Sequence, residues 1–249
     1  MRLVFLLFAP AAAQIVVNSS DLGVIAGLTE KIGSIEARVF RGIPYATLKD
    51  KTSGTFTRWA SPNLDVDLST FPAWNPAYEY DGETFGAYVA TEFSASCPNK
   101  LDSADPSLCR TCSTRNGDPT QTNSETDCLT LNIMRPTEEP LDFMPVFVYV
   151  HGGGGTVGSA EAYAKTSALV AKGAIVVTIQ YRLGVLGWFS SSALDEEEAI
   201  RSGGASGNQA LKDVIGALKW VRAYIEDFGG DNSRVTVFGQ SFGAAMMQL

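Results

Sequence analysis

The sequence predicts an α/β protein with a mostly parallel central sheet and helices on both of its faces. Three observations lead to this prediction. Residues 146–150 and 174–179 are continuous apolar runs, which are typical of strands buried on both faces. Residues 208–228 carry apolar side chains at three- and four-residue steps, which predicts an amphipathic helix that a pair of glycines ends. A third apolar run, 235–238, follows, and strands that alternate with helices indicate a parallel sheet.

The N-terminus has the pattern of a secretory signal. Arg2 precedes an apolar run at residues 3–8, and the small residues 11–13 follow it. This order predicts cleavage after Ala13, which leaves residues 14–249 as the folded part. A membrane span requires about 20 apolar residues, far more than this run holds, and no later segment is that long. We therefore expect a secreted protein without a membrane span.

The elements between the signal and the long helix are shorter. Residues 35–40 alternate between apolar and polar side chains, which predicts one strand of an early meander. The irregular stretch at 49–93 contains scattered aromatic residues and is expected to form loops packed on the body of the protein. A short strand is predicted at 129–134, and a helix at 161–172 separates the first two buried strands.

Composition and charge exclude some classes of partner. Hydrophobic residues make up 45% of the chain, which suffices for a sizeable core. The formal net charge is −8, and no cluster of basic residues occurs. An acidic surface argues against nucleic acid or an anionic membrane as a partner.

Four cysteines lie in one polar, turn-rich stretch: Cys97, Cys109, Cys112 and Cys128. In an exported chain an even number of cysteines indicates disulfides, and four cysteines allow three pairings. A zinc site is the competing interpretation, but the single C-x-x-C has no second pair of that spacing, so no metal is expected. Asn18 begins an Asn-Ser-Ser sequon, and we expect it to carry a glycan.

Two glycine-rich loops directly follow predicted strands, and such loops form the sites of parallel sheets. One loop places Ser241 between Gly239 and Gly243, in the small-x-Ser-x-small pattern of a nucleophile elbow. The other contains Gly153 and Gly154, whose N–H groups can approach a developing oxyanion because no Cβ atom is in the way. The N–H group that follows the serine is a third candidate donor.

The alternatives to this interpretation are weaker. A flexible linker would not directly follow a buried strand, and a phosphate-binding loop would need Gly-Lys followed by Ser or Thr, which is absent. For Ser241, a tight turn with an incidental serine stays an open alternative.

His151 is the only histidine, and it opens the glycine-rich loop. We expect it to shape that loop from behind and not to act as the base for Ser241. In this architecture the catalytic acid and histidine follow the serine in the chain. Only eight residues follow Ser241, and none of them is acidic or a histidine. We therefore expect both partners to be missing and the chain alone to be inactive.

The chain resembles the type-B carboxylesterase and cholinesterase family of α/β-hydrolases in five motifs that occur in the family's order. They are ARVFRGIPYA, TDCLTLNIMRP, PVFVYVHGGGGTVGSA, VVTIQYRLGVLGWFSS and GNQALKDVIGALKWVRAYIEDFGGDNSRVTVFGQSFGA. The resemblance implies a secreted serine carboxylic-ester hydrolase that uses no cofactor and takes a small-molecule ester as substrate. Ser241 would be the acyl-accepting nucleophile, and Gly153, Gly154 and Phe242 would form the oxyanion hole.

The resemblance also bears on the cysteines and on four departures from the family pattern. It implies a disulfide loop from Cys97 to Cys128, which leaves Cys109–Cys112 as a local pair. The family often has Glu before the nucleophile and Ala after it, where this chain has Gln240 and Phe242, and Thr126 takes the place of an acid. The first disulfide loop contains no Trp, which disfavours choline esters because cholinesterases hold the quaternary ammonium by cation–π attraction.

Members of this family are much longer and carry the catalytic acid and histidine in their second half. The resemblance therefore implies that residues 14–249 are the N-terminal part of an α/β-hydrolase domain, truncated after the nucleophile elbow. A non-catalytic, cholinesterase-like binding or adhesion protein is the alternative function, and an inactive short product is a further one.

Overall fold

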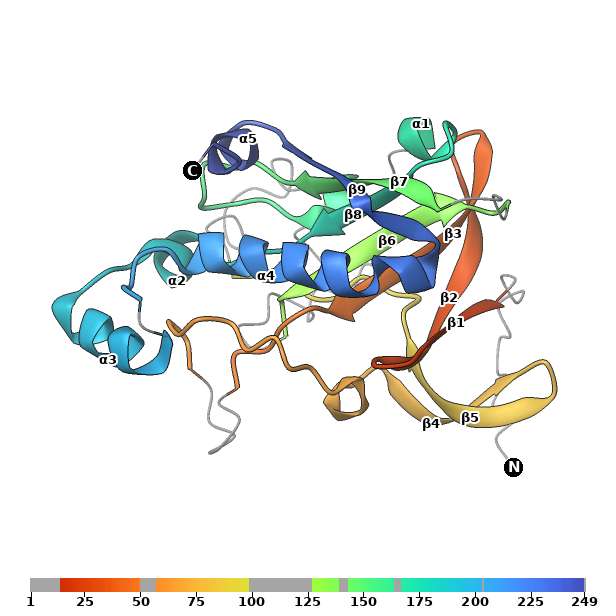
Figure 1. The fold of residues 1–249 in the computed structure, drawn as a ribbon, viewed down its shortest axis with the longest axis horizontal. Coiled ribbons are helices and arrows are strands. Elements are labelled where there is room, and N and C mark those ends of the chain that lie inside the picture. Colours follow the sequence, from red (N-terminus) through yellow and green to blue (C-terminus); the bar gives the residue numbers. More distant parts are fainter. Residues whose placement is uncertain are drawn as a thin grey trace, which may run out of the picture.

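The computed structural model describes residues 14–49, 57–98, 127–138, 143–163, 167–202 and 204–248 (Figure 1). Some positions named above lie outside the described residues: the predicted signal at 1–13, Cys109, Cys112 and Thr126. Within them, a nine-stranded sheet has the spatial order β4-β5-β2-β3-β6-β8-β7-β9, with β1 paired to β2.

The C-terminal part of this sheet is parallel. Strands β8 (Ile175–Ile179), β7 (Met144–Val150) and β9 (Gly230–Gly239) are neighbours that run in the same direction. Every residue of β8 is buried, as the continuous apolar run predicts. The three predicted strands at 146–150, 174–179 and 235–238 are these three elements, each with somewhat different ends.

The rest of the sheet is mainly antiparallel, so the sheet as a whole is mixed. Strand β6 (Thr130–Pro136) pairs antiparallel with β8 and with β3 (Ile35–Pro44). Strand β2 (Gly23–Ile32) pairs antiparallel with β3 and with β1 (Gln14–Ser19), and it makes a short parallel pairing with β5.

The expectation of loops at 49–93 is wrong for its second half, which contains a hairpin. Strands β4 (Trp74–Tyr80) and β5 (Glu83–Val89) pair antiparallel, and Tyr80 lies opposite Glu83. The two turn residues, Asp81 and Gly82, have φ values of 50° and 79°. Asp-Gly with both φ angles positive is the turn that matches the twist of a two-residue hairpin. A short 3-10 helix, η1 (Leu68–Thr70), precedes it.

Helices cover both faces of the sheet, as predicted. The long helix α4 (Gln209–Tyr224) crosses one face (Figure 1) and buries Val214, Ala217 and Val221 in the main core. On the other face, Val170 of α1 (Ser167–Val170) packs with Met134 and Val176.

The remaining helices are short. The predicted helix at 161–172 is described as a 3-10 helix, η4 (Ala160–Tyr163), and the single turn α1. The 3-10 helix η5 (Ile225–Phe228) extends α4 and ends at Gly229, whose φ of 81° gives the left-handed cap that favours glycine. Helix α5 (Phe242–Met246) directly follows Ser241, as the strand-to-helix turn of a nucleophile elbow predicts. The sequence reasoning did not place two others, α2 (Gly184–Trp188) and α3 (Ser192–Ser202).

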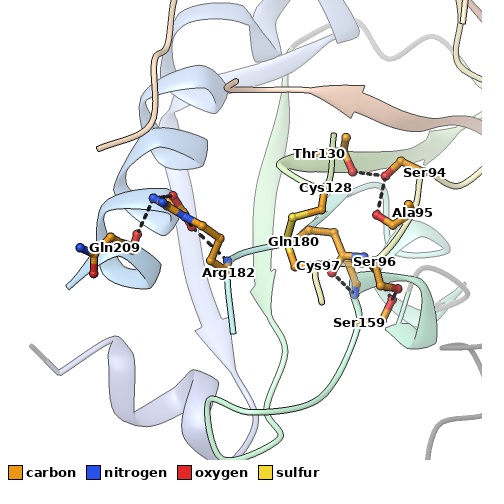
Figure 2. Close-up of a disulfide and its surroundings, with 12 residues drawn as sticks. Ser94, Ala95, Ser96, Cys97, Cys128, Thr130, Ser159, Gln180, Arg182 and Gln209 are labelled. Carbon is orange, nitrogen blue, oxygen red and sulfur yellow. Dashed lines mark hydrogen bonds and ion pairs between the residues drawn. A yellow bond between two sulfur atoms is a disulfide. The ribbon is translucent and has the colours of Figure 1, made fainter. Parts of the chain in front are cut away.

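A disulfide joins Cys97 to Cys128, the pair that the family resemblance implies, and both residues are buried. Figure 2 shows it between two hydrogen-bonded pairs of side chains. On one side the Ser94 and Thr130 hydroxyl groups are in contact, and on the other the Ser96 hydroxyl donates to Ser159. The disulfide therefore fastens the segment after β5 to the beginning of β6.

Candidate active site

The two glycine-rich loops leave the sheet side by side. Strands β7 and β9 are parallel neighbours, and their last residues, Val150 and Gly239, lie opposite each other. His151 follows the first strand and Ser241 follows the second within two residues. The loops therefore meet at the carboxyl end of the sheet, where open α/β sheets place their sites.

Ser241 lies at the apex of a sharp strand-to-helix turn. Its φ is 55° and its ψ is −121°. In the described part of the chain, Ser241 and Asp81 are the non-glycine residues with a positive φ. Such a conformation costs about 1–3 kcal/mol and persists only where the surroundings enforce it. The Gly243 N–H donates to the Gln240 carbonyl over 3.0 Å and closes the turn, and the Ser241 side chain is exposed to solvent.

Close backbone approaches explain why glycines flank this turn. A Cβ atom on Gly239 would lie 2.6 Å from the Gly243 carbonyl carbon, and one on Gly243 would lie 2.2 Å from the Val150 carbonyl oxygen. A Cβ on Gly152 would lie 2.5 Å from the Gln240 carbonyl oxygen and 3.1 Å from the Ser241 Cβ. Larger residues at these positions would push the two loops apart.

The glycine-rich loop presents free backbone donors. Gly153 and Gly154 have φ values of 116° and 64°, and the Gly153 carbonyl accepts from the N–H groups of Thr156 and Val157 over 3.1 Å each. Across the described residues, the N–H groups of Gly153, Gly154 and Phe242 donate to no other protein atom. Three such donors beside an exposed serine can stabilise the negative charge of a tetrahedral intermediate.

Trp188 is a site residue that the sequence reasoning missed. Its indole Nε1 donates to the Gly155 carbonyl over 3.1 Å, and the Gly184 N–H donates to the same oxygen over 2.7 Å. The Trp188 ring packs edge-on against Phe242, with centroids 5.4 Å apart. A Cβ on Gly155 would lie 2.8 Å from the Phe242 ring. Phe242, in the position after the serine, thus packs its ring on the end of the glycine-rich loop.

His151 is buried behind this loop. Its Nδ1 lies 2.9 Å from the Gly152 carbonyl oxygen, and its ring stacks on Tyr181 with centroids 4.3 Å apart. Its Nε2 is buried and has no hydrogen-bond partner among the described residues. This placement supports the expectation that His151 is not the base for Ser241, because neither ring nitrogen is hydrogen-bonded to the serine hydroxyl.

The pKa of His151 gives a testable pH dependence of stability. Burial lowers this pKa from 6.5 to about 4, and the hydrogen bond to Gly152 opposes that shift. At pH values between these two pKa values, the His151 imidazole binds a proton in the unfolded chain but not in the folded one, so the free energy of unfolding falls as the pH falls. The loss attributable to His151 is expected to reach up to about 3 kcal/mol.

Urea unfolding at pH 7 and pH 4.5 measures this loss. His151→Asn has no imidazole to titrate, so its free energy of unfolding should fall less between the two pH values than that of the wild type. Carboxylates contribute equally to both proteins and cancel in the comparison. An equal loss in the two proteins would contradict the lowered pKa.

Comparison with known sequences identifies relatives. The chain matches the sequence model of the carboxylesterase family over residues 77–249. A fumonisin B1 esterase from Sphingopyxis macrogoltabida is 47% identical over 124 residues, which are 49% of this chain and 22% of that protein. Carboxylesterase 3 from Pongo abelii is 38% identical over 211 residues, which are 84% of this chain and 31% of that protein.

Comparison with solved structures gives the same class of protein. A PNB esterase matches with a TM-score of 0.66 and 31% identity, over 93% of this chain and 39% of that one. The juvenile hormone esterase from Manduca sexta, solved with OTFP covalently attached, matches with a TM-score of 0.65 and 28% identity, over 94% and 37%. These neighbours have the α/β-hydrolase fold, which confirms the predicted fold. The chain spans well under half the length of each of these four proteins.

Proposed function

This chain belongs to the carboxylesterase family. We propose on that basis that it forms part of a serine carboxylic-ester hydrolase. One observation carries the proposal. The strained turn at Ser241 lies against a glycine-rich loop in which the N–H groups of Gly153 and Gly154 have no protein acceptor in the described chain. A binding or adhesion module has no need of either feature, so the arrangement favours catalysis.

The proposed reaction passes through an acyl-enzyme. The Ser241 Oγ attacks the ester carbonyl carbon, its proton passes to a base, and the C–O bond to the alcohol breaks as the alcohol takes up a proton. Water then attacks the acyl-enzyme, the acid is released, and the serine regains its proton. In both steps the N–H groups of Gly153, Gly154 and Phe242 bind the negatively charged oxygen.

The base and the acid that orients it are proposed to lie outside these 249 residues. His151 is the only histidine here, and its Nδ1 faces the Gly152 carbonyl. The relatives are several times longer than the stretches matched to this chain, which leaves room for both partners in a longer protein.

The isolated 249-residue chain is therefore expected to hydrolyse p-nitrophenyl acetate only weakly. Without a base, what remains is the residual rate from the oxyanion hole and substrate binding, about 10³–10⁴ over water in a hydrolase stripped of its triad. The rate is measured beside that of the natural-length protein, by which we mean the longer protein proposed to contain this chain together with the base and the acid. Fast turnover by the isolated chain that Ser241→Ala abolishes would contradict the proposed location of the base.

Covalent labelling tests the nucleophile directly. A fluorophosphonate probe should modify the natural-length protein at one residue, and mass spectrometry of the peptides should place the adduct on Ser241. An adduct on another serine, with turnover lost on labelling, would refute the proposed nucleophile.

Secretion and glycosylation are also proposed. No described helix is long and apolar enough to cross a membrane. The disulfide suits an oxidising compartment, and Asn18 is exposed on β1, which begins at Gln14, directly after the predicted cleavage site. The secreted protein should begin at Gln14 by N-terminal sequencing and lose mass on treatment with an N-glycosidase unless Asn18 is replaced by Gln. Protein retained in the cell with Met1 in place would contradict both predictions.

A further inference from the structure

The orientation of one peptide plane in the oxyanion loop, residues 152–155, depends on a side chain. A trans peptide is planar, so its C=O and the following N–H point in opposite directions. The Gly152 carbonyl faces the His151 ring, and the N–H of the same peptide belongs to Gly153, one of the three proposed oxyanion donors. A contact that fixes the direction of the Gly152 carbonyl therefore also fixes the direction of the Gly153 N–H group.

We propose that His151 is a positioning residue of the oxyanion loop. Its Nδ1–H donates to the Gly152 carbonyl and so keeps the Gly153 N–H turned toward the side on which Ser241 binds substrate. The inference rests on the proposed esterase function, and it adds a role for a residue that the reaction itself does not use.

The surroundings of the ring define the tautomer that this role requires. A carbonyl oxygen only accepts, so the Nδ1 atom, 2.9 Å away, must carry the hydrogen. The opposite tautomer would set two acceptors against each other at Nδ1. It would also place a buried N–H at Nε2, which has no partner among the described residues.

The ring is held from both sides. It stacks on Tyr181 at an interplanar angle of 20°, and the Tyr181 hydroxyl donates to the His151 carbonyl over 2.7 Å. On the loop side, a Cβ on Gly158 would lie 2.6 Å from the His151 Nδ1, so only glycine lets the loop close around the ring. The imidazole therefore fills the inside of the loop and cannot easily turn away.

The neighbouring peptide of the loop does not need this help. The Gly153 carbonyl accepts from the backbone N–H groups of Thr156 and Val157, and this turn fixes the Gly154 N–H in the same way. Between Gly152 and Gly153, by contrast, glycine tolerates both signs of φ, so the peptide can flip once its carbonyl loses the donor. Loss of the imidazole should thus remove one oxyanion donor of three.

A matched pair of variants in the natural-length protein tests the role. His151→Phe keeps an aromatic ring beside Tyr181 but has no donor, whereas His151→Asn keeps an N–H near the position of Nδ1. Removal of one oxyanion donor lowers kcat by about 10²–10³-fold. We expect His151→Phe to approach that loss for p-nitrophenyl acetate with little change in KM, and His151→Asn to regain most of the rate. Wild-type kcat in His151→Phe, or equal losses in both variants, would overturn the proposal.

A spectroscopic measurement tests the same proposal without activity. Long-range ¹H–¹⁵N spectra of protein labelled at histidine should show the Nδ1–H tautomer for His151 at neutral pH, assigned by the signal that His151→Asn lacks. The Nε2–H tautomer would overturn the proposal whatever the enzyme does. Turnover that survives in Ser241→Ala would instead refute the esterase mechanism and leave the tautomer result standing, so the two failures are distinguishable.

Discussion

Ser241→Ala is expected to lower kcat for p-nitrophenyl acetate in the natural-length protein by about 10⁴-fold or more. Alanine removes the only atom that can form the acyl-enzyme, and it leaves the backbone donors in place. Its methyl group occupies the position of the serine Cβ, so the strained turn at φ 55° is preserved and no new contact arises. The residual rate is then that of substrate held beside an oxyanion hole with water as nucleophile.

Two controls separate this effect from damage to the fold. Ser34, exposed in the turn between β2 and β3, is a matched serine far along the chain, and Ser34→Ala should keep the wild-type rate. The thermal midpoint of Ser241→Ala should stay close to that of the wild type because the Ser241 side chain makes no capping hydrogen bond. Turnover in Ser241→Ala at the wild-type rate would refute the nucleophile.

The parallel part of the fold was predictable because its signals are local. The apolar runs of β7, β8 and β9 mark strands buried between helices. Each of the two site loops can be recognised from the glycines that directly follow one of these apolar runs. The close approaches at Gly152 and Gly243 show why no larger residue fits there.

Helix α3 could not be found from apolar periodicity because it buries a charged side chain and exposes an apolar one. Among its residues 192–200 the buried side chain is Glu198, whereas Ile200 is 88% exposed. The carboxylate of Glu198 contacts the Ser61 hydroxyl and accepts from the Lys212 ammonium over 2.7 Å. In a sequence, an acidic residue predicts an exposed position, so the buried face of α3 does not show the apolar pattern that marks α4.

Trp188 and the β4–β5 hairpin were missed for different reasons. The hairpin had its signal, Asp-Gly between two aromatic segments, but the irregular stretch before it concealed it. Trp188 had none, because its role depends on a hydrogen bond to Gly155, which lies 33 residues earlier in the chain. Contacts between loops of separate strands follow only from the assembled sheet.

Asp213→Asn is expected to lower the free energy of unfolding by about 3–5 kcal/mol, the usual effect of breaking a buried ion pair. Asp213 on α4 accepts from Arg182 in the segment after β8, over 2.7 Å at Nε and 2.6 Å at Nη2. The side chains are 0% and 1% exposed, so the guanidinium would stay buried without its counter-charge. Figure 2 shows Arg182 reaching toward the helix beside Gln209.

A surface ion pair supplies the matched control for this measurement. Arg234 and Asp231 are joined over 2.6 Å, but the arginine side chain is 53% exposed. Water can solvate either partner of that pair alone, so Asp231→Asn should leave the urea midpoint near that of the wild type. Equal shifts for the two substitutions would contradict the argument that burial sets the size of the effect.

Removal of both charges distinguishes a lost attraction from a stranded charge. If the unpaired guanidinium dominates the loss in Asp213→Asn, the double variant with Arg182→Met should be more stable than Asp213→Asn alone. It should remain below the wild type, because Arg182 also donates to the carbonyls of Arg58 and Ala60 over 3.0 and 2.9 Å. The same segment carries Gly184, whose N–H holds the Gly155 carbonyl, so loosening it should also lower kcat while the fold persists. A double variant less stable than Asp213→Asn would show that those carbonyl contacts, and not the ion pair, hold the segment in place.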